Sequence, residues 1–154
     1  MPEPLRFEDF TKGRKFAFGD YVISQDEIIA FAEEYDPQPM HMDPEAAKHG
    51  MTGGLIASGW HMCALAMRLL KDGLLHDTTS LGSPGVDEVQ WRRPVRPGDR
   101  LRMEAEVLDA RASLSKPDRG FVTFRFDLFR SNPETERQLA MTYKSPIMIR
   151  KREA

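Results

Sequence analysis

The sequence predicts an α+β fold in which an antiparallel β-sheet wraps around one long central helix. Two observations lead to this prediction. The stretch Met51–Met67 contains no Asp, Glu, Lys or Arg. It leads into a long apolar segment whose composition is typical of a buried helix. After about residue 81, apolar and polar side chains alternate, as in strands with one face on a core and one in water. No repeat or linker divides the 154 residues, so we expect a single domain, residues 1–154.

The elements are predicted in order along the chain. A strand over residues 16–22 precedes a first helix, which Ser24 and Glu27 begin as a capping box and Asp36-Pro37 ends. A second, short helix is predicted to begin at Asp43-Pro44, where a capping side chain comes before the preferred first-turn proline. This second helix is expected to stop near Gly50.

A third helix is predicted to start around Ser58-Gly59 and to stop at Gly73. Its residues are apolar nearly all round, so we expect the helix to be buried inside the fold rather than to lie across its surface. Strict alternation predicts strands over residues 101–107 and 122–128, and a last strand contains residues 139–143. The sequences Pro97-Gly98-Asp99 and Ser131-Asn132-Pro133 predict turns.

Composition excludes several classes of protein. The 22 basic and 24 acidic residues give a net charge of −2, which provides no large positive field for nucleic acid. A single cysteine, Cys63, forms neither a disulfide nor a multi-cysteine metal site within the chain. Met51–Met67 is too short and too polar to cross a bilayer core of about 30 Å, and the N-terminus lacks the signal-peptide pattern. We expect a cytoplasmic protein with no nucleic-acid partner and no membrane partner.

The candidate chemistry lies between the first two helices, in residues 35–43. Asp36 and His41 stand five positions apart on a loop that contains two prolines, which restrict the backbone. An Asp and a His that converge on one water form an acid–base pair. From these residues alone, an ordinary helix stop and a solvated loop histidine are the more common interpretation.

The glycine-rich start of the third helix is the second candidate feature. A glycine there lets a ligand approach the backbone, and a helix N-terminus offers unpaired N–H groups to an oxyanion. The alternative is that Gly53, Gly54 and Gly59 only shape a tight turn into the helix. The spacing alone does not decide between the two.

Over roughly Phe7 to Ile149, the sequence resembles a known family. The segments D-P-Q-P-x-H-x-D-P-E-A-A, G-G-L-x-A-S-G-W-H and S-P-G-V-D-E-V-x-W-x-x-P-V-x-P-G-D are similar to those of the MaoC-like dehydratases, relatives of the (R)-specific enoyl-CoA hydratases. The resemblance implies a hotdog fold, in which an antiparallel sheet wraps a long helix. It also implies that two subunits join their sheets near the acyl site, so a homodimer or higher homo-oligomer is expected.

The resemblance implies a role for each site residue. Asp36 and His41 match the catalytic pair, and Gly59 matches the glycine whose N–H polarises the thioester carbonyl. Its neighbours Ser58 and Trp60 are assigned with it to substrate binding. The implied reaction interconverts 2-enoyl-CoA and 3-hydroxyacyl-CoA, with the acid–base pair sharing one water and neither member fixed as the base. The expected partner is an acyl-CoA or acyl-carrier-protein thioester; no metal is expected, and no cofactor besides the coenzyme A of the substrate.

Three positions depart from the family pattern. Gln38 stands where an Asn is common, Ser58 where a His or Pro is frequent, and Ala64 where some relatives have a hydroxyl residue. These changes bear on substrate choice and leave the acid–base pair in place. Two other functions stay open: a hotdog acyl-CoA thioesterase and a non-catalytic acyl-CoA-binding subunit.

Other candidate residues have simpler explanations. An arginine cluster is able to meet coenzyme A phosphates, but a solvated strand face with ordinary salt bridges is favoured; its members are Arg92, Arg93, Arg96, Arg100 and Arg102. His61 is expected to make a polar contact in the core, and Cys63 to pack as a small hydrophobe. Trp60 and Trp91 are expected to pack or to line an acyl tunnel.

Overall fold

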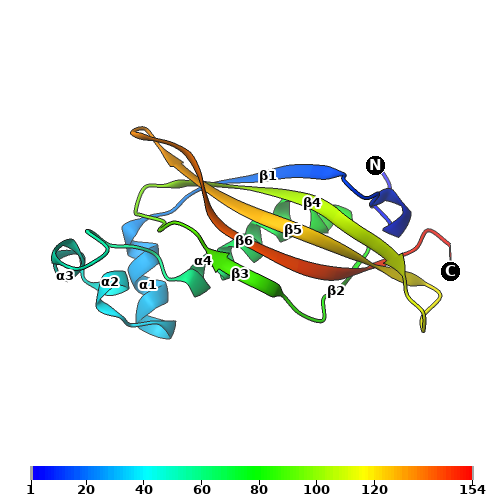
Figure 1. Ribbon diagram of the computed structural model, residues 1–154, viewed down its shortest axis with the longest axis horizontal. Coiled ribbons are helices and arrows are strands. Elements are labelled where there is room, and N and C mark those ends of the chain that lie inside the picture. The colour runs from blue at the N-terminus through cyan, green and yellow to red at the C-terminus, as the bar shows by residue number, and fades with distance from the viewer. Residues whose placement is uncertain (1, 154) are drawn as a thin grey trace.

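The long helix α4 (Gly59–Gly73) lies behind a six-stranded antiparallel sheet in the computed structural model, which describes residues 2–153 (Figure 1). The strands follow the order β1-β4-β5-β6-β2, and β3 also pairs with β6. Their bounds are β1 Lys15–Val22, β2 Ser80–Gly82, β3 Asp87–Trp91, β4 Arg100–Ala112, β5 Arg119–Asn132 and β6 Thr135–Arg150. This arrangement confirms the predicted α+β class.

Three short helices gather at one end of the sheet, away from both termini (Figure 1). They are α1 (Gln25–Tyr35), α2 (Pro39–Met42) and α3 (Pro44–His49), and two single 3₁₀ turns, η1 (Phe7–Asp9) and η2 (Leu75–Asp77), complete the chain. Within residues 2–153, no helix combines the length and the hydrophobicity that a membrane crossing requires.

Local capping residues fix the helix ends where the sequence predicts them. The Ser24 hydroxyl accepts a hydrogen bond from the Glu27 N–H at 3.1 Å, and the Glu27 carboxylate accepts one from the Ser24 N–H at 3.2 Å. Asp43 Oδ1 accepts the first free N–H groups of α3 at 3.1 and 3.2 Å. These contacts satisfy donors that have no partner inside the helix, so the predicted starts of α1 and α3 are confirmed.

One predicted loop is a helical turn. Pro39 occupies the first position of α2, where its fixed φ suits a helix and its missing N–H costs no hydrogen bond. The Asp43 N–H closes the turn on the Pro39 carbonyl oxygen at 2.9 Å. Pro39 therefore starts a helical turn where a loop was expected, while Pro37 stays outside it. The turn holds His41 in a buried position, with only 5% of it exposed.

The core lies between α4 and the concave face of the sheet. Alternate residues of β4 and β5 face it, and the register places Met103 opposite Leu128 and Ala105 opposite Phe126. From α4, Met62, Ala66 and Leu70 meet this face at helical spacing. Burial of these alternating side chains is the main source of stability for the sheet and explains why period-two patterning located the strands.

One face of α4 is open, which differs from the prediction of a helix buried all round. Trp60 is 64% exposed and Met67 is 48% exposed, and both lie beside the β3 end of the sheet. Trp91 of β3 is 48% exposed, and its ring centroid lies 5.6 Å from that of Trp60. We call Trp60, Met67, Val86 and Trp91 the open apolar face. The apolar residues of α4 therefore form two surfaces. One packs on the sheet of this chain, and the other belongs to the open apolar face.

A buried ion pair holds the turn before β4. Asp99 is 1% exposed, and its carboxylate accepts hydrogen bonds from Arg130 Nε at 2.6 Å and Arg130 Nη2 at 3.1 Å. The Asn132 amide and the Arg96 N–H donate to the same carboxylate at 3.0 and 2.9 Å. Every lone-pair direction of Asp99 is thus used, and the predicted turn at residues 97–99 is fixed to β5.

Candidate active site

Asp36 and His41 meet where α1 ends and α2 begins. Asp36 is the C-cap residue of α1, and the turn of α2 brings His41 back toward it, so that His41 Nε2 lies 3.3 Å from Asp36 Oδ2. The five-residue spacing therefore describes a real pair of side chains. Residues 36–38 connect the helices without helical structure, and the turn of α2 takes the place of the rest of the expected loop.

Two neutral donors hold the Asp36 carboxylate. The Ser58 hydroxyl donates to Oδ2 and the Gln38 side-chain amide donates to Oδ1, each at 2.6 Å. The hydrogen bond from Ser58 contributes most to lowering the pKa of Asp36, followed by the bond from Gln38, with partial burial opposing them and the nearby His41 assisting. Asp36 is therefore an ionised carboxylate at neutral pH, with an oxygen facing the imidazole.

The backbone fixes the tautomer of His41. Its Nδ1 lies 2.8 Å from the Ile56 carbonyl oxygen. A carbonyl oxygen only accepts hydrogen bonds, so Nδ1 carries the proton. The other ring nitrogen, Nε2, faces Asp36 and is the atom left to gain or lose a proton.

A cavity of about 610 Å³ opens beside this pair. Asp36, His41, Gly59 and Trp60 all line it, so four of the five predicted site residues meet at one place. Ser58 is the exception: it is fully buried and its hydroxyl points to Asp36. The structure therefore shows Ser58 acting on the carboxylate, and its assignment to substrate binding stays a prediction.

Gly59 brings the start of α4 to the cavity wall. The Ser58 side chain caps none of the free N–H groups of α4, and its hydroxyl donates to Asp36. The Gly59 N–H lies in the first turn, where a helix has no internal acceptor for it. The N-terminal end of α4 therefore presents donor groups and positive dipole character to the cavity.

Trp91 was missed as a neighbour of this glycine. Its indole N–H donates to the Gly59 carbonyl oxygen at 3.0 Å, and a Cβ on Gly59 would overlap the indole ring. The absence of a side chain at position 59 thus lets β3 approach α4. In the sequence, Trp91 stands out only as part of the segment W-x-x-P-V. That segment contains no local signal of a contact with Gly59 in α4, 32 positions away.

A second cavity of about 420 Å³ lies between α4 and the sheet. Trp60 borders both cavities, and no charged side chain is found among the described residues that line the second one. Its walls are formed by apolar and small polar residues, among them Cys63, Met67, Val89, Phe126 and Tyr143. This lining is suited to an apolar group.

The arginine cluster divides into two groups. Arg100 and Arg102 lie on β4 and pair with Asp20 at 3.4 and 3.8 Å, which confirms the expected salt-bridged strand face for these two. Arg92, Arg93 and Arg96 line the first cavity instead. For them the expectation of ordinary salt bridges is wrong, because the segment that follows β3 places them along the cavity.

Two other residues in α4 lie near the site without joining it. His61 stacks on Phe31 with ring centroids 4.5 Å apart, and its Nδ1 is buried with no hydrogen-bond partner among the described atoms. The polar contact expected there is absent at that nitrogen, and burial lowers the pKa of the ring. Cys63 packs with its sulfur 3.7 Å from that of Met141, and burial raises its pKa, as expected for a small hydrophobe.

The relationship to known proteins follows from the whole chain. The sequence profile of the family described as MaoC like domain matches residues 9–120. The chain belongs to this family. Among curated relatives, the uncharacterized protein YdeM of Bacillus subtilis is 36% identical over 106 residues, which cover 68% of this chain and 74% of that protein. The 3-hydroxyacyl-thioester dehydratase Z of Mycobacterium tuberculosis is 33% identical over 99 residues, which cover 62% of this chain and 66% of that protein.

Several solved structures have the same architecture. A MaoC-like dehydratase from Rhodospirillum rubrum is 36% identical with a TM-score of 0.82, over 97% of this chain and 99% of that chain. An (R)-hydratase from Pseudomonas aeruginosa shares the fold at 23% identity and a TM-score of 0.73, over 96% and 87% of the two chains. A Mycobacterium tuberculosis protein with a double hotdog fold matches 96% of this chain with 44% of its own, at 18% identity and a TM-score of 0.79. The fold is the hotdog fold, as the sequence resemblance implied.

Proposed function

We propose that the protein is an acyl-thioester hydratase and dehydratase, which interconverts 2-enoyl and 3-hydroxyacyl thioesters. The observation that carries the proposal is the ionised Asp36 beside His41 Nε2 at 3.3 Å, in a cavity that also contains the start of α4. The named activities of the dehydratase and hydratase relatives support the same chemistry.

In the proposed mechanism, His41 is the base and Asp36 assists it. In hydration, His41 Nε2 removes a proton from water while the water oxygen bonds to the β-carbon. The electrons of the carbon–carbon double bond shift toward the thioester oxygen, and the imidazolium then returns a proton to the α-carbon. Asp36, whose pKa is lowered by Ser58 and Gln38, accepts a hydrogen bond from the water and stabilises the imidazolium. Dehydration is the reverse, and neither direction changes the net proton count.

The Gly59 N–H would stabilise the negative charge on the thioester oxygen. This charge exists only in the transition state and intermediate, so a fixed donor there accelerates the reaction instead of only tightening binding. Loss of one such donor typically costs on the order of 100- to 1,000-fold in rate.

The proposed enzyme is a homodimer. Its support is the open apolar face, together with β3, which pairs with β6 and with no other strand of residues 2–153. A second copy would cover both the exposed side chains and the free strand edge. Light scattering on a size-exclusion column measures the mass, and Met67→Asp should weaken the dimer by placing a charge in its contact. A monomeric wild-type protein contradicts this part of the proposal.

The test is the ultraviolet absorbance of the enoyl thioester in crotonyl-CoA, measured in parallel with a thiol-trapping reagent. We expect absorbance to fall without release of thiol, because hydration leaves the thioester intact. Release of thiol at the same rate as the loss of absorbance would identify the protein as a thioesterase. Stabilisation of the protein by crotonyl-CoA with no turnover would mean a non-catalytic binding subunit, and either result overturns the proposal.

A further inference from the structure

We propose that Arg92, Arg93 and Arg96 form a subsite for the phosphate groups on the carrier arm of the thioester. This inference rests on the proposed function, because it names the part of the substrate that lies over the mouth of the first cavity. The three side chains line the same cavity as Asp36 and His41.

Backbone carbonyls hold two of the arginines in place. Arg96 Nη2 donates to the Thr52 carbonyl oxygen at 2.6 Å, and Arg93 Nη1 donates to the Leu139 carbonyl oxygen at 3.0 Å. The Arg96 backbone is fixed in turn by the buried Asp99. Each guanidinium has five N–H donors, so these bonds orient the groups and leave most donors for a ligand.

The three guanidinium groups lack counter-charges. Within residues 2–153, none of them has a carboxylate oxygen within 4.0 Å, whereas Arg125, Arg130 and Arg152 elsewhere pair with carboxylates.

The only carboxylate among the described residues that line the cavity is Asp36, which already accepts hydrogen bonds from Ser58 and Gln38. The three arginines therefore give the cavity a local excess of positive charge, although the chain as a whole has a net charge of −2. A guanidinium fork binds phosphate with paired, charge-assisted hydrogen bonds.

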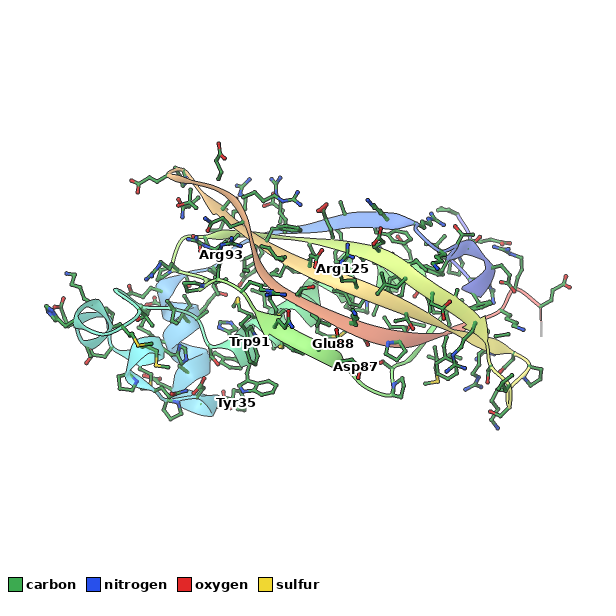
Figure 2. The ribbon with its side chains drawn as sticks, in the orientation of Figure 1. Tyr35, Asp87, Glu88, Trp91, Arg93 and Arg125 are labelled. Carbon is green, nitrogen blue, oxygen red and sulfur yellow. The ribbon has the colours of Figure 1, made fainter. Side chains whose placement is uncertain are left out.

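The position of the arginines favours the carrier over the acyl group. Trp91 contacts Gly59, where the thioester carbonyl would bind, and Arg92 and Arg93 follow Trp91 directly in the chain. Figure 2 shows Trp91 and Arg93 at the same end of the molecule, with Tyr35 nearby at the end of α1. Arg92 and Arg93 are exposed. This is expected of residues at the cavity mouth that contact the carrier arm of the thioester, which faces solvent. The second cavity, with no charged lining among the described residues, is left for the acyl chain.

The test compares substrates with and without phosphate. For the double variant Arg92→Gln/Arg93→Gln, we expect KM for crotonyl-CoA to rise roughly tenfold with kcat unchanged, because exposed charge-assisted bonds to the carrier are lost. The kinetics with crotonyl-N-acetylcysteamine, a neutral thioester without phosphate, should be unchanged. Arg102→Gln is the matched control, because it removes an arginine of the same sequence cluster from the other group. An equal loss with both thioesters overturns the inference.

Binding measurements separate this inference from the proposed function. Calorimetry with coenzyme A, phosphopantetheine and pantetheine needs no turnover, so the subsite can be tested even if crotonyl-CoA is not hydrated. The wild type should bind coenzyme A more tightly than pantetheine, and the double variant should lose that preference. Equal loss for phosphopantetheine and coenzyme A identifies the phosphate shared with acyl carrier protein, and loss for coenzyme A alone identifies the nucleotide phosphates. No preference for phosphate in the wild type overturns the inference.

Discussion

Asp99 and Asp36 differ in the partners that hold their carboxylates. Asp99 is buried, and Arg130, Asn132 and the Arg96 N–H use all its acceptor positions. Asp36 receives only neutral donors from Ser58 and Gln38, and its third neighbour, His41, stands at 3.3 Å on the wall of an open cavity. The first carboxylate is locked, and the second is oriented but still able to meet water.

The difference agrees with a structural role for Asp99 and with the catalytic role proposed for Asp36. The planar guanidinium of an arginine holds an aspartate in one position through paired hydrogen bonds. An imidazole partner can accept and release a proton at one ring nitrogen, so the pair can move a proton during a reaction. Substitutions in the two regions should therefore affect different measurable properties.

The largest expected effect is on turnover. His41→Ala removes the atom that exchanges the proton, and we expect the rate of crotonyl-CoA hydration to fall on the order of 100- to 10,000-fold. Thermal unfolding is measured in parallel to show that the variant is folded, because the substitution also removes the buried bond from Nδ1 to the Ile56 carbonyl oxygen. His49→Ala, which alters an exposed histidine of α3, is the control and should keep full activity.

The next effect is on stability. Asp99→Ala leaves the Arg130 guanidinium buried without its partner, which should lower the free energy of unfolding by about 3–5 kcal/mol in urea denaturation. Asp20→Ala, which breaks only exposed pairs with Arg100 and Arg102, should cost about 1 kcal/mol or less. Equal effects of the two substitutions would mean that the buried pair does not hold the turn.

A smaller effect tests how Ser58 acts. Ser58→Ala removes the contact that lowers the pKa of Asp36 most, so the acid limb of the profile of kcat/KM against pH should move to higher pH. Ser113→Ala, distant from the site in the hairpin between β4 and β5, should leave the profile in place. An unshifted acid limb in Ser58→Ala would contradict the assignment of Asp36 as the ionised partner.

The hydrogen bond from Ser58 to Asp36 also makes the stability of the protein depend on pH. Because the folded pKa of Asp36 lies below 3.8, the stabilisation is present above that pH and is lost as the pH falls through the lowered pKa. The difference in unfolding free energy between wild type and Ser58→Ala should therefore be larger at neutral pH than in acid.

The smallest effect concerns the contact between α4 and β3. Gly59→Ala should push the Trp91 ring outward, because the new Cβ would overlap it. The free energy of unfolding should fall by only about 1 kcal/mol, because the ring is half exposed and can shift. In a Trp60→Phe background, tryptophan fluorescence reports Trp91 alone, and its emission should shift toward that of solvent-exposed indole. Unchanged emission would show that the ring does not depend on the missing side chain.

Local chemistry explains what was predictable from the sequence. Ser24 with Glu27, and Asp43 with Pro44, satisfy helix ends within three residues, so their patterns determined the helix starts. Alternation located the long strands because one face of each is buried. Contacts distant in sequence left no such local pattern: Ser58 reaches Asp36 across 22 positions, and Trp91 reaches Gly59 across 32. Composition also showed that α4 is apolar without showing which face this chain would leave uncovered.

Hydration by the Asp36–His41 pair is tested most directly with oxygen-18 water. Crotonyl-CoA is incubated with the wild type and with Asp36→Asn in labelled water, and the acyl-CoA is followed by mass spectrometry. We predict that the wild type yields an intact thioester carrying one labelled hydroxyl, and that Asp36→Asn yields almost none in the same time. Labelled free acid with released coenzyme A, no incorporation by the wild type, or equal incorporation by both proteins would contradict the proposed reaction.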